Sequence, residues 1–274
     1  MRDGGRLAAA IEVLDDIETR HRPARLALKT WGERSRFAGS KDRAFVSGLV
    51  LDVLRKRRSL GWRMGADSNR AAAIGALRFE WGWTSQAIAE ACADEDHGPG
   101  ALSAAEAAAL ETPADLAAAP DPVRGDYPDW LDEDLGRAFG ARRVDEAQAL
   151  AQRAPVDLRV NLLKSDPVRA LKALSPLGPE TVDLLDGGRR IPAPDPARRA
   201  GAVETIPAFS KGWFEVQDLG SQIAASCAGE VKGRQVLDLC AGGGGKTLAL
   251  ASVMGNTGQI YAYDSDARRL TDTI

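Results

Sequence analysis

Cysteine and histidine are scarce in this 274-residue sequence, and their scarcity limits the kinds of site that it can form. The three cysteines have neither the spacing of a zinc site nor that of a disulfide framework. The two histidines, His21 and His97, lie among polar residues, so we expect no metal site and no histidine-based catalytic triad. This cysteine usage is typical of the reducing cytoplasm, where we expect the protein to be found.

Long apolar runs are also absent. No stretch has the length that is needed to cross a bilayer. The segment Arg2-Asp3-Gly4-Gly5 leads into an amphipathic run rather than the uniformly apolar run of a signal peptide, so we expect no membrane partner. The apolar fraction of 44% is ordinary, so a core can form, and the length predicts one and a half to two domains.

Four consecutive glycines mark the most informative segment, which runs from residue 236 to residue 247. Residues 236–239 predict a buried strand, and residues 247–253 predict an apolar helix. A strand that leads through a glycine turn into a helix N-terminus is a common ligand cradle in α/β folds. The next predicted strand, 259–263, ends at Asp264, whose carboxylate could accept hydrogen bonds from both hydroxyls of a ribose.

Two phosphate-binding patterns fail at this loop. The P-loop pattern G-x-x-x-x-G-K-[ST] would need a glycine at Cys240, and the dinucleotide pattern G-x-G-x-x-G would need one at Thr247 or Leu248. An adenosyl ligand without phosphates remains, and S-adenosylmethionine is the usual one. The alternative is a plain tight turn between a strand and a helix, in which Asp238, the glycines and Asp264 are incidental.

The same residues resemble a known family. The segment Asp238-Leu239-Cys240-Ala241-Gly242-Gly243-Gly244-Gly245-Lys246-Thr247 is similar to the D-x-C-A-A-P-G-G-K-T cofactor loop of the Sun/Fmu/RsmB-type RNA (cytosine-C5)-methyltransferases. Residues 214–222 resemble the Q-D-x-x-S-Q segment of that family, and residues 158–161 with Lys164 resemble its R-V-N-x-x-K strand. Gly242-Gly243 replaces the usual Ala-Pro, which makes the loop more flexible.

The resemblance implies S-adenosylmethionine as the cofactor and RNA, ribosomal RNA first of all, as the substrate. The residues that would bind the cofactor are then Cys240, Ala241, Gly242, Gly243, Gly244, Gly245, Lys246 and Asp264.

Methylation at C5 of a pyrimidine also needs a cysteine, because a thiolate must add to C6 before C5 becomes nucleophilic. In the family the cysteines for this chemistry come from later strands, so we expect the catalytic residues after Ile274 and an inactive chain without them. Cys92 lies in the helical part and Cys240 in the cofactor loop, while Cys227 is expected to pack within a helix.

Residues 1–118 predict helices. Ser40 is the expected cap of a helix with an apolar stripe at Phe45, Leu49, Val50, Val53 and Leu54, and Ser103 with Glu106 forms a capping box. The helices resemble the NusB-like RNA-binding domain that some family members carry at the N-terminus. The predicted fold is therefore α followed by α/β: a helical NusB-like domain (1–125), linker helices with a small α+β RNA-binding subdomain (126–210), and the first βαβ part of a truncated Rossmann-like methyltransferase core (211–274).

Within the small subdomain a βαβ pattern is predicted, with strands over 157–163 and 181–185 and a helix over 167–174. Residues 187–200 predict a polar, proline-rich loop. Its four arginines either meet RNA or lie on a mobile connection: Arg189, Arg190, Arg198 and Arg199.

Basic residues concentrate near the N-terminus. The first 60 residues contain 14 Lys/Arg and 8 Asp/Glu, a net charge of +6, although the whole chain has a net charge of −3. Such a basic face favours contact with RNA phosphates. The alternative is a solvated helix end that interacts with the helix dipole. The candidate RNA-binding residues are Arg34, Arg36, Lys41, Arg43, Arg55, Lys56, Arg57 and Arg58.

The sequence thus predicts an S-adenosylmethionine-dependent RNA (cytosine-C5)-methyltransferase that acts on ribosomal RNA and whose catalytic half lies outside these residues. The alternative is a non-catalytic RNA-binding module of NusB type. A nucleotide hydrolase is disfavoured, because Cys240 occupies the position of the first glycine of a P-loop.

Overall fold

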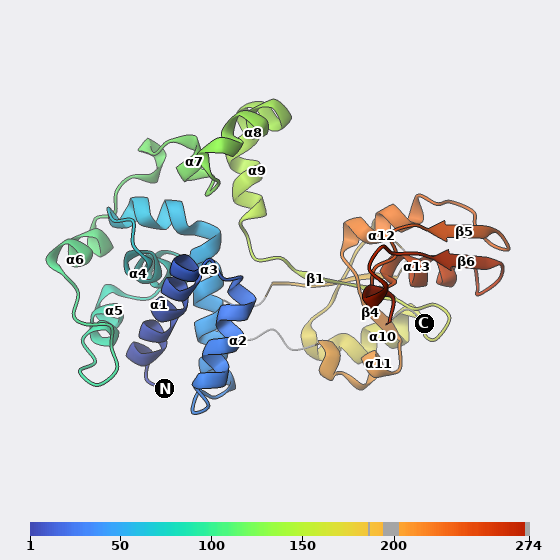
Figure 1. The fold of residues 1–274 in the computed structure, drawn as a ribbon, viewed down its shortest axis with the longest axis horizontal. Helices are drawn as coiled ribbons and strands as arrows, with labels where there is room; N and C mark the ends of the chain where they lie inside the picture. The colour runs from blue at the N-terminus through green and yellow to red at the C-terminus, as the bar shows by residue number, and fades with distance from the viewer. Residues whose placement is uncertain (186, 194–202, 272–274) are drawn as a thin grey trace. The chain divides into compact units, whose positions relative to one another are not determined.

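The computed structural model describes residues 1–185, 187–193 and 203–271. Contacts divide the described residues into two units, one formed by residues 1–153 and the other by residues 154–193 and 203–271. The first unit is helical, and the second combines helices with two small sheets (Figure 1). The chain therefore has mixed α and β structure, as predicted.

The first unit is built from helices that are joined by short turns. Its helices are α1 (Asp3–Arg20), α2 (Ala24–Arg34), α3 (Ser40–Met64), α4 (Asn69–Phe79), α5 (Ser85–Cys92), α6 (Ala104–Glu111), α7 (Asp121–Arg124), α8 (Asp132–Phe139) and α9 (Arg143–Leu150). The predicted capping box opens α6: the amide of Glu106 donates to Ser103 Oγ at 3.1 Å, and the amide of Ser103 donates to Glu106 Oε2 at 2.8 Å.

Helix α3 forms the centre of the helical core. The predicted stripe is buried at Leu49, Val50 and Val53, and these side chains share one core with α1 and α4. Each such side chain contributes about 1.5–3 kcal/mol by leaving water. Leu54, the last residue of the predicted stripe, is exposed. The prediction that Ser40 caps this helix is wrong. Ser40 is the first residue of α3, and the N-cap is Gly39, whose backbone amide donates to Asp42 Oδ2 at 2.9 Å.

The buried carboxylate of Asp52 ties α3 to the end of this unit. It accepts hydrogen bonds from Trp81 Nε1 at 2.9 Å and from Arg153 Nη2 at 2.6 Å. Arg55 completes the cluster at 3.1 Å. A buried charge is stable only when it is paired and hydrogen-bonded, and Asp52 meets both conditions.

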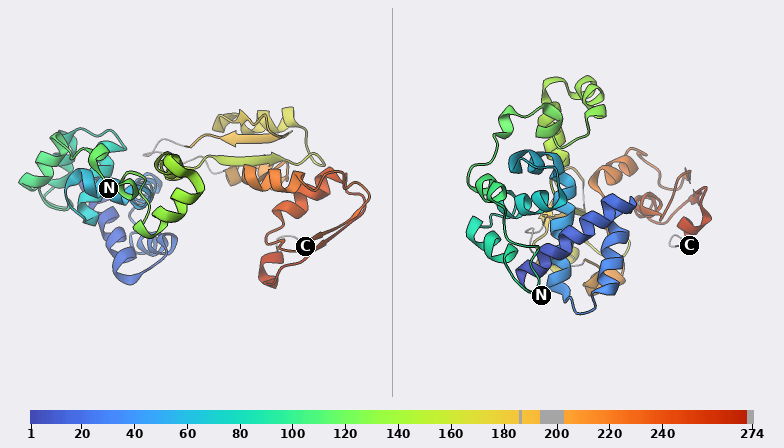
Figure 2. Two further views of the ribbon diagram at one scale, coloured as in Figure 1. Left: turned by 90° about the horizontal axis from the view of Figure 1, so that it is seen from above. Right: turned by 60° about the vertical axis from the view of Figure 1, so that its left-hand side comes forward.

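The second unit begins with an antiparallel sheet in the strand order β2-β3-β1-β4. The elements around it are β1 (Val156–Val160), α10 (Pro167–Leu174), β2 (Glu180–Thr181), β3 (Gly188–Ile191), α11 (Pro207–Ser210), β4 (Phe214–Val216) and α12 (Leu219–Ser226). The left view of Figure 2 shows the sheet between the yellow helix α10 and the orange helix α12.

Strand β1 has one apolar and one polar face, because successive side chains of a strand point to opposite sides. Leu158 is fully buried in a small core with Leu174 of α10 and Phe214 of β4. Asp157 and Arg159 lie on the other face, where both are also buried. Because both side chains are charged and buried, each needs a hydrogen-bond or ion-pair partner on this face.

Three predictions for this subdomain are wrong. Strand β1 ends at Val160, because Asn161 begins a turn in which its side chain accepts a hydrogen bond from the amide of Leu163 at 3.1 Å. The predicted strand over 181–185 is reduced to the two residues of β2. The predicted loop 187–200 contains β3, which pairs with β1, and the sheet is antiparallel rather than of βαβ type. Arg198 and Arg199 lie outside the described residues.

The second sheet consists of two parallel strands, β5 (Gln235–Asp238) and β6 (Gln259–Ala262), with helix α13 (Gly245–Val253) between them in the chain. Val236 and Ile260 pack toward Leu250 and Met254. The prediction that β5 is buried is wrong for its other face, where Leu237 is 60% exposed. Within the described residues each strand has one neighbouring strand, and α13 covers one face only.

Candidate cofactor site

The glycine-rich loop connects β5 to α13 as predicted. Gly242 and Gly244 have φ angles of 53° and 80°, in the left-handed region that glycine adopts without strain. The amide of Ala241 donates to the carbonyl of Tyr263 at 2.9 Å, and the amide of Tyr263 donates to the carbonyl of Asp238 at 2.9 Å. The loop therefore continues the pairing of β5 with β6 beyond the ends of both strands.

Asp264 holds this loop from the end of β6. One carboxylate oxygen accepts from the amide of Gly242 at 2.9 Å, and the other accepts from the amide of Asp266 at 3.0 Å. These amides and the guanidinium of Arg269, 3.7 Å away, hold the pKa of Asp264 below its usual range. A carboxylate can accept about four hydrogen bonds, so Asp264 has capacity left for hydroxyl donors.

A second contact fixes the start of α13. The hydroxyl of Thr247 donates to Asp238 Oδ2 at 2.7 Å, which joins the last residue of β5 to the first turn of the helix. Between these two anchors the backbone stays open, because a Cβ added at Gly243 would meet no atom within 4 Å. The loop thus has a fixed path and is open at Gly243, whereas Ala241, Gly242 and Gly244 are buried.

The polar face of β1 reaches the same loop through Gln217. The guanidinium of Arg159 is 8% exposed; it donates to Gln217 Oε1 at 2.7 Å and pairs with Glu215. The Gln217 amide lies 3.6 Å from where a Cβ on Gly245 would stand. Burial lowers the pKa of Arg159 and raises that of Glu215, and the two charges oppose both shifts.

Asp157, on the same polar face of β1, connects the sheet to the first residue of α12. Its carboxylate accepts from Arg190 Nε at 2.6 Å and from the backbone amide of Leu219 at 3.0 Å. The guanidinium of Arg190 holds the pKa of Asp157 below its usual range. Arg190 is thus paired within the sheet and Arg189 is buried, so neither arginine lies on the free loop that the sequence predicted.

Sequence reasoning placed neither Arg159 nor Gln217 among the site residues. Both lie in the two segments, R-V-N-x-x-K and Q-D-x-x-S-Q, that resemble the family. Their spacing alone does not show that they meet, because Arg159 and Gln217 are 58 positions apart and their contact forms only when β1 pairs with β4.

Comparisons with known proteins find similar sequences and a similar fold. Residues 229–274 match the family model described as 16S rRNA methyltransferase RsmB/F. The probable ribosomal RNA small subunit methyltransferase B of Synechocystis sp. is 34% identical over 147 residues, which cover 53% of this chain and 32% of the relative. The chain is thus similar to members of the RsmB/F family in these segments. The ribosomal RNA small subunit methyltransferase B of Escherichia coli O6:K15:H31 is 32% identical over 145 residues, with 53% of this chain and 33% of that relative covered.

This chain matches about a third of the length of these curated RsmB/F relatives. A solved structure described as the crystal structure of PH0851 superposes with a TM-score of 0.62 at 19% identity. The superposition covers 99% of this chain and 66% of that chain, which shows a shared fold.

The predicted RNA-binding residues have different surroundings. The side chains of Arg55, Lys56, Arg57 and Arg58 each contact an acidic residue of the helical unit. Arg43 donates to backbone carbonyls of Gly32 and Ala38 at 2.7 and 3.0 Å. These five side chains therefore have a structural role first, and their contact with RNA stays a prediction.

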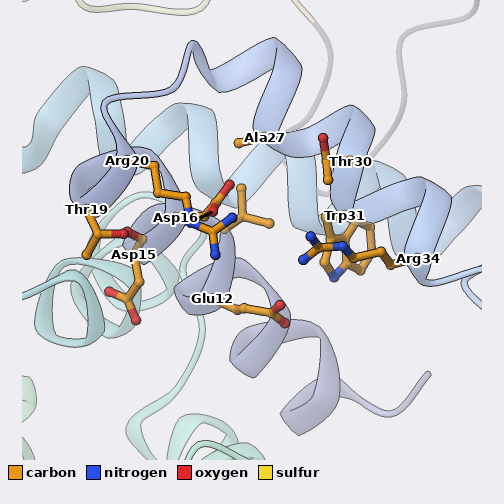
Figure 3. A pocket seen from close by; sticks show the side chains of 10 residues that line it. Glu12, Asp15, Asp16, Thr19, Arg20, Ala27, Thr30, Trp31 and Arg34 are labelled. Atoms are coloured by element: carbon orange, nitrogen blue, oxygen red, sulfur yellow. Dashed lines mark hydrogen bonds and ion pairs between the residues drawn. The ribbon is translucent and has the colours of Figure 1, made fainter.

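Arg34 lines a cavity of about 210 Å³ between α1 and α2 (Figure 3). Three acidic side chains, Glu12, Asp15 and Asp16, line the same cavity, together with Trp31. Arg20 also lines the cavity and pairs with Asp16, so the charges of Glu12 and Asp15 are the ones that oppose the approach of a phosphate to Arg34. Arg36 and Lys41 are exposed, and within residues 1–185, 187–193 and 203–271 they form no ion pair.

The three cysteines occupy different surroundings. Cys92 is buried in the helical unit, where burial raises the pKa of its thiol. Cys227 and Cys240 are exposed, so the expectation that Cys227 packs within its helix is wrong.

The described part of the chain contains no group of His, Cys, Asp and Glu that could hold a metal ion. It also contains no helix that is long and apolar enough to span a membrane.

The depressed pKa of Asp157 predicts a pH-dependent contribution to stability. Asp157 stabilises the folded state above its unfolded pKa of about 3.9, and this contribution disappears as the pH falls through the lower folded value. Wild type should therefore lose more unfolding free energy on acidification than Asp157→Asn does. Urea unfolding can be followed through fluorotryptophan NMR of Trp213, the single tryptophan after residue 153.

The exposed Asp183, which has no ion pair among the described residues, provides the control. Asp183→Asn should follow the wild-type pH profile. A wild-type profile in Asp157→Asn as well would contradict the assigned role of Asp157.

Proposed function

We propose that this chain is part of an S-adenosylmethionine-dependent RNA (cytosine-C5)-methyltransferase that acts on ribosomal RNA. The observation that carries this proposal is the loop over residues 239–244, whose backbone is fixed at Gly242 by Asp264 and stays open at Gly243. The family match and the names of the relatives support methyl transfer to ribosomal RNA.

The residues of the loop fit an adenosyl ligand. Asp264 is charged, lies at the end of β6 and has lone pairs left for the hydroxyls of a ribose. The glycines let a ligand approach the main chain of the segment from Cys240 to Lys246. S-adenosylmethionine would supply the methyl group, attached to a sulfonium.

A thiol that adds to the pyrimidine is the remaining requirement. Cys92 is buried among helices and Cys240 belongs to the cofactor loop. Cys227 follows α12 at its C-terminal end. We therefore assign the reacting thiol to sequence outside these 274 residues, an assignment that agrees with the extra length of the relatives.

In the helical unit, which we assign to a NusB-like RNA-binding domain, Arg36 and Lys41 are the predicted RNA contacts with the fewest competing interactions. Both are exposed and flank the start of α3. Their charges are available to phosphates, whereas the paired cations of α3 would first have to leave their carboxylates.

Replacement of Asp264 tests the cofactor assignment. In the natural full-length protein, Asp264→Ala should weaken S-adenosylmethionine binding by about 1–3 kcal/mol, because ribose hydroxyls lose a charged acceptor. Calorimetric titration measures the change. Asp266→Ala is the matched control two residues away and should bind nearly as wild type does; unchanged affinity in Asp264→Ala would mean that the ribose is held elsewhere.

The assignment of the thiol predicts that the 274-residue chain alone transfers no methyl group to RNA. Ribosomal RNA and S-adenosylmethionine with a labelled methyl group provide the assay, with the full-length protein as positive control. Turnover by this chain that disappears in Cys240→Ala would show that Cys240 is the nucleophile and that the assignment is wrong.

A further inference from the structure

Two exposed cations lie over the ring of Trp213 in the second unit, and a third lies beside the neighbouring Gly212. The guanidinium carbon of Arg169 lies 3.9 Å from the centroid of the Trp213 ring, and the ammonium of Lys211 lies 5.4 Å from it. The ammonium of Lys164 lies 3.3 Å from the position of a Cβ on Gly212, between Lys211 and Trp213. We call Lys164, Arg169, Lys211 and Trp213 the Trp213 cluster.

The cations of this cluster lack carboxylate partners. No ion pair joins Lys164, Arg169 or Lys211 to an acidic residue in the parts of the chain that the structure describes. Two carboxylates are near in the fold, but Asp166 caps α10 by accepting the amide of Arg169 at 2.9 Å, and Glu215 is paired with Arg159. Lys164 acts on Glu215 only at longer range, where it lowers the pKa of that carboxyl.

The cations of helix α3 differ from those of the Trp213 cluster in their partners. The four consecutive cations of α3 are each neutralised by a carboxylate, although they form the densest basic run of the sequence. The three cations of the Trp213 cluster have no such carboxylate partner among the described residues. A bound anion would supply the opposite charge that they lack.

The backbone holds the cluster in place. The amide of Trp213 donates to the carbonyl of Ala208 at 3.1 Å, and the amide of Asn161 donates to the carbonyl of Trp213 at 2.9 Å. The ring packs on the core that contains Phe214 and Leu174. Cation–π attraction then keeps Arg169 and Lys211 at the ring, so little order remains to be gained on binding.

We propose that the Trp213 cluster is a binding site for the phosphates of single-stranded RNA, a proposal that rests on the proposed RNA substrate. The guanidinium offers a planar fork that matches a phosphate, and the two ammonium groups add point charges beside it. Basic side chains that alternate with an aromatic ring are the usual composition of a surface for single strands. The site places RNA on the sheet whose opposite face holds the cofactor loop through Arg159.

Salt-dependent binding tests the site. The affinity of a fluorescein-labelled single-stranded oligoribonucleotide is measured over a salt series for wild type and for the triple variant Lys164→Gln, Arg169→Gln, Lys211→Gln. Each lost phosphate contact should reduce the slope of log K against log salt by about 0.7, so the triple variant should lose about two units of slope. All three positions are exposed, so the variant should fold as wild type does.

The matched control is Lys232→Gln, at an exposed lysine of the same unit that has no ion pair among the described residues. It should keep the wild-type slope. A wild-type slope in the triple variant would overturn the Trp213 cluster and leave the proposed function intact. Absence of RNA binding by wild type itself would overturn the RNA substrate and the cluster together, while the titration with S-adenosylmethionine would still test the cofactor assignment.

Discussion

The buried guanidinium of Arg159 is the contact on which the arrangement of the second unit depends. It lies on the polar face of β1, where it joins Glu215 of β4 to Gln217 at the entry to α12. A buried ion pair stabilises little beyond its desolvation cost, but the loss of one partner leaves an uncompensated charge. Such a pair acts chiefly as a constraint on geometry, and here it constrains Gln217, whose amide lies beside Gly245 of the glycine-rich loop.

The loop itself is held by contacts from both strands of the small parallel sheet. Asp238 at the end of β5 fixes Thr247, and Asp264 after β6 fixes Gly242. Parallel sheets are normally covered on both faces, whereas Leu237 and Tyr261 are exposed here. The loop is therefore held by local polar contacts among the described residues.

Local sequence patterns predicted the structure correctly where an element depends mainly on residues close to it in the sequence. The strand, glycine turn and helix of the cofactor loop and the capping box at Ser103 were predicted correctly. The family was also predicted correctly, and the glycine loop that suggested it lies within the matched residues.

Local sequence patterns predicted the structure wrongly where strand pairing or ion pairing involves residues that are distant in the sequence. The residues of strand β3 were predicted to form a loop because their sequence is polar. They pair with β1 and β2 in the sheet, where Arg190 also forms an ion pair with Asp157. The basic run of α3 suggested a free surface because three of its four cations pair with carboxylates that are distant in the sequence, such as Glu80. Lys164 and Arg169 lie close together in the sequence, but Lys211 and Trp213 are more than 40 residues away, so only the fold brings the two segments together.

Hydrogen–deuterium exchange of the full-length protein, with and without S-adenosylmethionine, tests most directly whether the loop held by Asp264 and by the polar face of β1 is the cofactor site. Protection is expected at residues 239–247 and 263–266, with a smaller effect near Gln217, whose amide lies beside Gly245. The helical unit should show no change. Protection confined to the helical unit, or none at the loop when the cofactor is in excess of its dissociation constant, would contradict the assignment.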